Sequence, residues 1–469
     1  MGNAGPSQIA LSYGLEDVPR PFPRALGLGL QHVLTMFGGT ILVPLLLGPE
    51  MGMDAAQTAI LVSSAFICSG IATLLQVTVG SRLPIIQGVS FAFLVPFFAI
   101  IAAHPGPEAM TYIAGLILVG AIVETTIGFS GLFGLLRRYV TPITIAPVIA
   151  LIGLSLFEPA AQTSGLYWPM ALLMLALVFT FSLVLSRKHK FFSLFPVLLA
   201  IVISYGVALL LTLTGVFEEG SAAAVDFAGV TEASWIRGVE VGDGGVLWPW
   251  GLPRFDWSLL VGVLAAYLAS MVESFGDYHA ISQMATGRDP EARTINRGIG
   301  AEGLGCFATG LFGGFASTSY SQNIGLVGLT RVASRYVVGV GAVILLALGL
   351  VAKFGAVVAT IPQPIVGGAY LALFGLIAAI GLSLLRRVDM DSQRNLLIVG
   401  FVLFAGFVFP SYFESARDID ILGIDWLTDI VVSIGSSGIA TAAVLGLLLD
   451  NLIPGTPEER GLRLPHELG

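Results

Sequence analysis

Charged residues are scarce in this sequence. Asp, Glu, Lys and Arg make up 11% of the 469 residues, whereas 55% are hydrophobic. Soluble globular domains carry about 25% charged residues, so this composition excludes a soluble globule and indicates a chain that crosses a lipid bilayer many times. The net charge is −8 and no basic patch is present, so no nucleic-acid partner is expected.

Cysteine is almost absent as well. Cys68 and Cys306 each lie inside an apolar run, with no neighbouring Cys or His. This arrangement favours structural thiols over a disulfide or a metal site. The sequence also lacks a P-loop, a zinc-protease HExxH and a nucleophile elbow. We therefore expect no enzymatic activity, no cofactor and no metal.

Long hydrophobic runs dominate the chain. About fourteen segments of roughly twenty residues are expected to cross the bilayer. They lie near 25–48, 55–79, 85–103, 110–136, 141–158, 168–186, 193–214, 257–283, 294–313, 315–331, 332–358, 362–386, 393–412 and 429–450. A long polar loop occupies 215–256, and the segments at 141–158 and 315–331 are short for a full crossing.

The basic residues predict the orientation. With a cytoplasmic N-terminus, eighteen of the 22 Lys and Arg residues fall in inward loops, and only Arg237, Arg254 and Arg417 fall in outward loops. This bias predicts a multi-pass protein of the cell membrane with both termini in the cytoplasm.

Two of the segments are interrupted at matching places. The third opens with the polar stretch 84–93 and the tenth with 314–323, each before an apolar run. Broken segments survive at membrane depth only where they line a cavity, and matching breaks in two halves point to a site near the midplane. Since each half has seven segments, the two repeats run in opposite directions. The half-helix N-termini suit an electron-rich ligand.

Four ordered motifs resemble the nucleobase–ascorbate transporter family. The run Gln322-Asn-Ile-Gly, followed after four residues by Thr330-Arg331, is similar to the family signature. The other motifs are Gln31-His32, Gln87-Gly-Val-Ser-Phe-Ala-Phe93 and Glu273-Ser-Phe-Gly-Asp277. The resemblance extends from about Pro21 to Asn451.

The resemblance implies an all-α membrane protein of two inverted seven-span repeats. Short antiparallel strands in spans 3 and 10 would each lead into a half-helix, and we also expect a homodimer. The expected divisions are 1–20 cytoplasmic tail; 21–158 spans 1–5, of which 1–4 are core; 159–214 gate spans 6–7; 215–256 extracellular or periplasmic loop; 257–358 core spans 8–11; 359–451 gate spans 12–14; and 452–469 cytoplasmic tail.

Two carboxylates in the eighth span are candidate site residues. Glu273 and Asp277 are four residues apart and share one helix face. An acid within a span needs a partner, a proton or water. The resemblance makes Glu273 the carboxylate that accepts hydrogen bonds from ring N–H groups of a base. For Asp277, a functional role and a capping role at the cytoplasmic end are both open.

The tenth and third spans supply the other substrate contacts that the resemblance implies. The amide of Gln322 offers a donor and an acceptor that match one N–H/C=O pair of a base. Ser321 would offer a backbone N–H. Phe91 would stack on the base or offer its own N–H.

Supporting roles follow from the same resemblance. His32, with Gln31, is expected to hydrogen-bond within the site, and Asn323 to tie strand to helix. Two further acids have no sharp role: Glu124 is expected to make a packing hydrogen bond or relay a proton, and Glu302 to pair with Arg297 or Arg331.

The resulting hypothesis is a proton-coupled symporter of a nucleobase, with a purine such as xanthine or urate favoured over uracil. In the family, uracil members tend to carry Glu where Gln322 stands and His where Asp277 stands. The alternatives are a sodium-coupled transporter of ascorbate-like organic anions and an anion channel or exchanger. Ascorbate members carry Pro in place of Gln322 and use sodium, and no Asp/Asn oxygen cluster for sodium is evident here.

Overall fold

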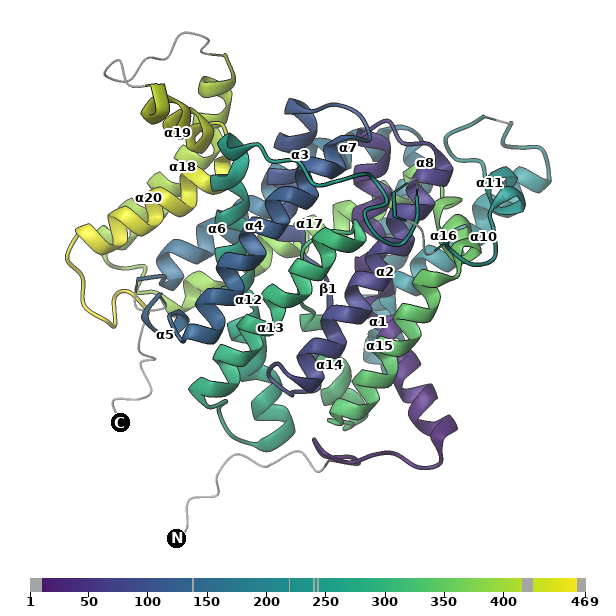
Figure 1. Cartoon of the computed structure of the whole chain (residues 1–469), viewed down its shortest axis with the longest axis horizontal. Helices are drawn as coiled ribbons and strands as arrows, with labels where there is room; N and C mark the ends of the chain where they lie inside the picture. The colour runs from purple at the N-terminus through teal and green to yellow at the C-terminus, as the bar shows by residue number, and fades with distance from the viewer. Residues whose placement is uncertain are drawn as a thin grey trace.

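The described part of the chain is a bundle of helices. The computed structural model describes residues 11–136, 139–218, 220–238, 241–242, 244–415 and 425–461. Figure 1 shows many of the helices running along one direction, with the strand β1 near the centre of the bundle. Parts of both predicted tails and the outward Arg417 lie outside these residues.

The first half of the chain contains both long and short helices. Its elements are α1 (Phe22–Glu50), α2 (Ala55–Thr78), β1 (Gln87–Val89), a 3₁₀ turn (Phe91–Phe93), α3 (Leu94–Ala103), α4 (Ala109–Ser130), α5 (Phe133–Leu136), α6 (Pro142–Ser155), α7 (Phe157–Gly165), α8 (Trp168–Phe179), α9 (Lys190–Leu194), α10 (Pro196–Leu213) and α11 (Ala228–Glu232). Capping residues and prolines determine where several helices begin. Asp54 caps α2 through a capping box. Pro142 and Pro196 occupy the first positions of α6 and α10, where the backbone N–H that proline lacks would have no helical partner.

The second half repeats this pattern. Its elements are α12 (Leu260–Thr286), α13 (Ala292–Phe312), β2 (Ser317–Ser319), α14 (Ser321–Thr330), α15 (Arg335–Leu350), α16 (Ala352–Ala359), α17 (Gln363–Leu384), α18 (Gln393–Ser415), α19 (Asp425–Gly435) and α20 (Gly438–Leu452). Left-handed glycines at Gly287 and Gly313 end α12 and α13.

The helices are long and apolar enough for a membrane. Within the described residues, nine of them could cross a bilayer, and the bent pair α15 and α16 raises the number to ten. Two shorter apolar helices, Phe91–Ala103 and Gly438–Leu452, accompany them. The prediction of an all-helical, multi-pass protein is confirmed, whereas the number fourteen stays a prediction. The segment expected at 332–358 consists of two helices, because the chain bends by 80° between Leu350 and Ala352.

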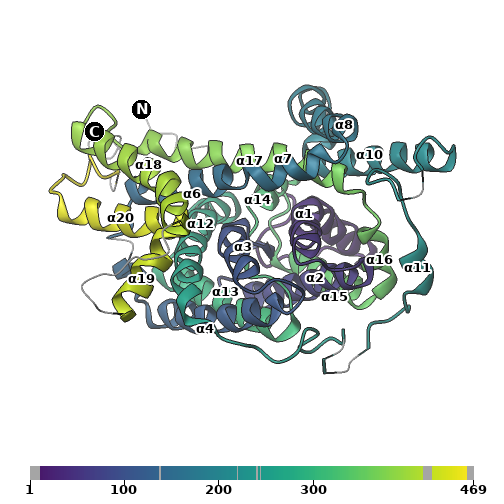
Figure 2. The ribbon, with the colours of Figure 1, turned by 90° about the horizontal axis from the view of Figure 1, so that it is seen from above.

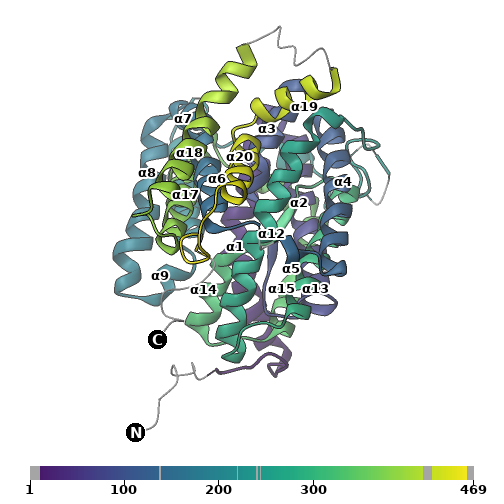
Figure 3. The same ribbon diagram turned by 90° about the vertical axis from the view of Figure 1, so that its left-hand side faces the viewer.

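The helices form two groups, each with its most extensive packing inside the group. Helix α13 packs on α2 and α4, and α15 packs on α1 and α2. Helix α17 packs on α6, α7 and α8, while α20 packs on α6 and α18. In Figure 2, α17, α7 and α10 form a row along one side of the cluster that contains α1, α2 and α15. Figure 3 shows α20, α18 and α6 together in the foreground.

The two interrupted segments meet in the middle. Strands β1 and β2 pair antiparallel, with Gln87 opposite Ser319 and Val89 opposite Ser317. The pairing continues beyond the strands, since the Ser90 N–H donates to the Ala316 carbonyl at 2.9 Å and the Tyr320 N–H to the Ile86 carbonyl at 3.0 Å. This ribbon satisfies the backbone of both extended stretches, and a half-helix begins directly after each strand.

Candidate functional site

A cavity of about 1420 Å³ lies beside the strand crossing. One wall comes from β1, α12 and the start of α14, and the other from α6 and α17. Of the eight residues that the sequence singled out, five line this cavity: Phe91, Glu273, Asp277, Ser321 and Gln322. They come from three elements far apart in the chain, so the fold gathers them at one place.

Glu273 faces the cavity without a protein partner. Its side chain is exposed there, and it forms no hydrogen bond or ion pair with any residue that the structure describes. A carboxylate in a membrane-spanning helix needs a proton, a cation or a donor from a ligand. Glu273 is therefore free to bind something that enters the cavity.

Asp277 is fixed by α14. The hydroxyl of Ser321 donates to both carboxylate oxygens of Asp277, at 2.8 and 3.0 Å. Ser321 is the first residue of α14, so the Asp277 carboxyl group lies close to a helix N-terminus, where the partial positive charge favours its ionised form. This contact joins α12 to the half-helix. Asp277 is itself buried and lies one helical turn from Glu273.

Gln322 follows at the second position of α14. Its side chain lines the cavity, is exposed, and makes no hydrogen bond to a described residue. An amide carries two donors and an acceptor, so Gln322 can hydrogen-bond with complementary groups on a planar ligand. Phe91 lies at the start of the other half-helix, and its ring contacts Phe374 of α17 edge to face, with centroids 6.3 Å apart.

The supporting residues lie behind this surface. The Asn323 amide donates to the His32 carbonyl at 2.9 Å and lies 3.2 Å from His32 Nδ1, so it ties α14 to α1. Both residues are buried, and neither lines the cavity. Gln31 does not line the cavity either, and its side chain contacts no polar group among the described residues.

Glu302 accepts hydrogen bonds from three hydroxyl groups of α12, an environment that was not predicted from the sequence. Its carboxylate accepts hydrogen bonds from Ser270 at 2.9 Å, Ser274 at 2.5 Å and Tyr278 at 3.0 Å. The expected pairing with Arg297 or Arg331 is wrong: Arg297 instead donates to the Val79 carbonyl. The sequence does contain a pattern that indicates such a site: the hydroxyl residues at 270, 274 and 278 recur every four residues and share one face of α12.

The Glu302 network reaches the strands. The Ser274 hydroxyl also lies 2.9 Å from the Ser319 hydroxyl of β2, within hydrogen-bond distance, and Gln87 of β1 donates to the same Ser319 hydroxyl at 3.0 Å. A chain of hydrogen bonds therefore runs from α13 through α12 to both strands. The remaining acid, Glu124, is buried in α4, and its carboxyl oxygens have no partner among the described residues, so the expected packing hydrogen bond is not formed.

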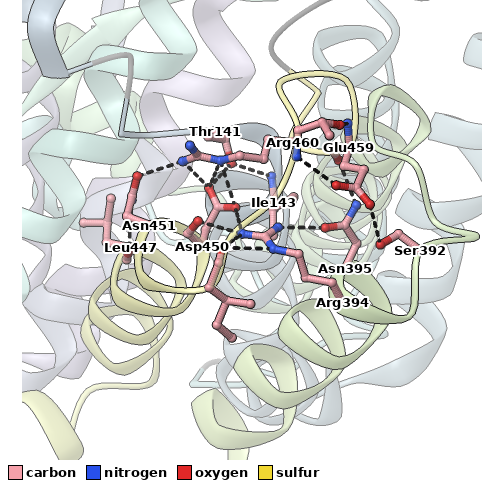
Figure 4. Close-up of polar contacts among 12 residues, drawn as sticks. Thr141, Ile143, Ser392, Arg394, Asn395, Leu447, Asp450, Asn451, Glu459 and Arg460 are labelled. Carbon is pink, nitrogen blue, oxygen red and sulfur yellow. Dashed lines mark hydrogen bonds and ion pairs between the residues drawn. The ribbon is translucent and has the colours of Figure 1, made fainter.

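One end of the cavity is bounded by the last described segment. Asn451, Arg460 and Gly461 line it there. Figure 4 shows why this segment is fixed: the fully buried carboxylate of Asp450 accepts hydrogen bonds from Thr141 at 2.7 Å and forms ion pairs with Arg394 and Arg460, each at 3.0 Å. These contacts join the start of α6, the start of α18 and the end of α20.

Comparison with known proteins identifies the family. A sequence profile described as the Permease family matches residues 24–415. Solute carrier family 23 member 2 of Mus musculus is 38% identical over 508 residues, which cover 98% of this chain and 77% of the relative. The chain belongs to the nucleobase–ascorbate transporter family of permeases. Nucleobase-ascorbate transporter 2 of Arabidopsis thaliana is 33% identical, over 96% of this chain and 90% of the relative. These relatives are transporters, and the family member described here is likewise not an enzyme.

Solved structures show the same fold at low identity. The transmembrane domain of the cyanobacterial bicarbonate transporter BicA matches with a TM-score of 0.56 at 16% identity, over 91% of this chain and all of that one. The murine solute carrier 26 family member A9 anion transporter, in its inward-facing state, matches with a TM-score of 0.62 at 12% identity, over 93% of this chain and 69% of that one. At these identities the comparison establishes a membrane transporter fold and nothing finer.

Proposed function

We propose that this permease is a proton-coupled symporter of a nucleobase, with a purine such as xanthine or urate preferred over uracil. The observation that carries the proposal is the pair formed by Glu273 and Gln322. Both side chains line one cavity beside the strand crossing, and both lack a partner among the described residues.

The two side chains have complementary hydrogen-bonding capacity. The Glu273 carboxylate accepts N–H groups from a base, and the Gln322 amide pairs with an adjacent N–H and C=O. The N-terminus of α14 adds backbone N–H groups with a partial positive charge, which suit a carbonyl or a negatively charged edge. The Phe91 ring contributes an apolar surface on the opposite half-helix.

Proton coupling is assigned to Glu273. It has no basic partner among the described residues, so a proton is the simplest cation to neutralise it within the membrane. In the described part of the chain no group of three or more His, Cys, Asp or Glu residues could hold a metal ion. Asp277 and the Asn323–His32 pair would hold α14 in place while the substrate binds.

We also propose an architecture in which a core and a gate enclose the cavity. Two inverted seven-span repeats would give a core of spans 1–4 and 8–11 and a gate of spans 5–7 and 12–14, with the cavity between them. We also propose cytoplasmic termini and a homodimer. The packing of α13 with α2 and α4, and of α17 with α6 to α8, supports the division into core and gate.

A sodium-coupled transporter of ascorbate-like anions is the second candidate. It is favoured by the plant relatives, whose names include both nucleobase and ascorbate. Gln322, at the cavity and at the first position of the signature, favours a base instead. The third candidate, an anion channel or exchanger, rests on fold similarity alone.

Uptake into proteoliposomes separates these candidates. Radiolabelled xanthine, urate, uracil and ascorbate are offered with an imposed pH gradient or an imposed sodium gradient. The proposal expects accumulation of a purine with the pH gradient, and loss of accumulation on adding a protonophore. Accumulation of ascorbate that requires sodium and survives the protonophore would establish the second candidate.

A further inference from the structure

A second hollow lies outside the substrate cavity. A groove of about 720 Å³ runs between residues 18–22, the first turns of α1, the end of α2 and one face of α15. Its volume falls within the range of about 300–1,000 Å³ that is typical of ligand pockets. Figure 1 shows the chain before α1, drawn in purple, running beneath the lower ends of α14 and α15.

The walls of this groove are apolar and open to the surroundings. Phe22 is 67% exposed, Leu26 43% and Val343 57%, and all three line it. In a protein whose helices are immersed in a bilayer, such a surface is in contact with lipid chains. The groove therefore offers an apolar surface on which a hydrocarbon chain can lie.

A free positive charge lies at one end. Arg20 lines the groove, is exposed, and forms no hydrogen bond or ion pair with a described residue. The other arginine of the lining, Arg335, is neutralised by Glu16 at 2.7 Å. The nearby Asp17 carboxylate is also occupied, since it accepts the Gly14 N–H at 2.7 Å. Arg20 is thus left to pair with an anion from outside the protein.

The wall that carries Arg20 is held in place. The Ser12 N–H donates to the Arg331 carbonyl at 2.8 Å, and the Ala333 N–H donates to the Tyr13 carbonyl at 2.9 Å. The Ser334 hydroxyl donates to the Asp17 carbonyl at 2.5 Å. These contacts fix residues 12–17 against the linker between α14 and α15, so Arg20 is presented at a defined position.

We propose that this groove binds one anionic phospholipid. Its acyl chain lies between α1, α2 and α15, and its phosphate pairs with Arg20. A lone exposed arginine next to an apolar groove matches a molecule that is charged at one end and apolar along its length. The same end of the bundle is the cytoplasmic side in the proposed orientation, where anionic lipids attract basic residues.

The test compares lipid binding by four forms of the intact protein. Wild type, Arg20→Gln, Gly339→Leu and Gly400→Leu are purified in detergent and titrated with phosphatidylglycerol or phosphatidylcholine, and bound lipid is counted by native mass spectrometry. Gly339 lies in the groove, and a Cβ there would meet only Val77 at 3.7 Å, so the backbone accepts a side chain at this position and Leu would occupy the groove. Gly400 of α18 has open space as well and does not line the groove, so it is the matched control.

We expect wild type and Gly400→Leu to retain phosphatidylglycerol in preference to phosphatidylcholine. Arg20→Gln should weaken this binding by about fivefold, the effect of one basic residue at an anionic lipid surface. Gly339→Leu should abolish the binding of one lipid. Glycerol 3-phosphate, which has the headgroup without the chain, should not compete. Equal retention by all four proteins, or competition by glycerol 3-phosphate alone, would overturn the proposal. Because Arg20 is exposed, Arg20→Gln is expected to fold, and it tests the proposal even if Gly339→Leu does not fold.

Discussion

The ring of Tyr320 packs directly on Gly88. A Cβ at Gly88 would lie 1.8 Å from Tyr320 Cε2, so only glycine fits beside this ring. The Tyr320 hydroxyl donates to the Val89 carbonyl at 3.1 Å, which holds the ring across the paired strands. This contact joins the two interrupted segments at the point from which both half-helices start.

Gly88→Ala should therefore disturb the strand crossing. The added methyl forces the ring or the strands apart, and overpacking of this kind costs about 1–3 kcal/mol. We expect a lower unfolding temperature in detergent and reduced uptake. Gly375→Ala is the control, because a Cβ at Gly375 meets nothing within 4 Å. If the Gly88→Ala protein is as stable and active as the control, the ring does not hold the crossing.

Asp450 should be a major source of stability at the end of the cavity. Its carboxylate is fully buried between Arg394 and Arg460, and removal of one partner from such a group costs about 3–5 kcal/mol. We expect Asp450→Ala to lower the free energy of unfolding by that amount, and Asp450→Asn by less, since the amide still accepts a hydrogen bond. Denaturant unfolding measures both. Asp389→Asn, at an exposed site, should have little effect; an equally small effect of Asp450→Ala would contradict this account.

The segment before α1 should be held less tightly in acid. The Arg335 guanidinium hydrogen-bonds to Glu16 and lowers the pKa of the Glu16 carboxyl below its ordinary value. A lowered pKa in the folded state means that the stabilisation is present at neutral pH and is lost as pH falls through that pKa. Glu16→Gln should therefore lower the unfolding temperature at neutral pH, and the difference from wild type should vanish in acid. Glu158→Gln, which removes an exposed carboxylate, is the control. A difference that stays constant with pH would refute the role of this ion pair.

Gln322→Glu should shift the substrate preference from purine toward uracil. A base carbonyl that faces the amide would lose its donor and meet a negative charge, and a polar group left without a partner costs about 1–3 kcal/mol. Since each 1.4 kcal/mol is about tenfold in affinity, purine binding should weaken at least severalfold. Competition of unlabelled xanthine and uracil against labelled substrate measures the ratio. An unchanged ratio would show that Gln322 does not discriminate between bases.

Much of the fold could be predicted from hydropathy. The apolar runs locate most of the long helices, and the polar stretches at 84–93 and 314–323 locate the breaks. A polar extended backbone is tolerated in a membrane only where it is buried in protein or lines a cavity, so these stretches stand out from the rest. The bend at Leu350 is not apparent in the sequence because residues 346–360 are mostly apolar and carry no proline. Hydropathy identifies the apolar stretches, but it does not show where a bend divides one stretch into two helices.

The candidate site was partly predictable for a similar reason. Motif positions place Glu273, Ser321 and Gln322 near one another, and the structure brings all three to the cavity. Contacts such as Asp450 with Arg394, or Tyr320 with Gly88, join distant parts of the chain, and no local pattern encodes their pairing. Their discovery required the tertiary structure.

The most direct test of the central claim is uptake by Glu273→Gln. If Glu273 binds the base and carries the proton, the amide variant will not accumulate a labelled purine in proteoliposomes under an imposed proton gradient, although it folds and has the unfolding temperature of wild type. The variant keeps the size of the side chain and removes only its charge and its proton. Accumulation at the wild-type level by Glu273→Gln would contradict both roles and remove the main support for proton-coupled nucleobase transport.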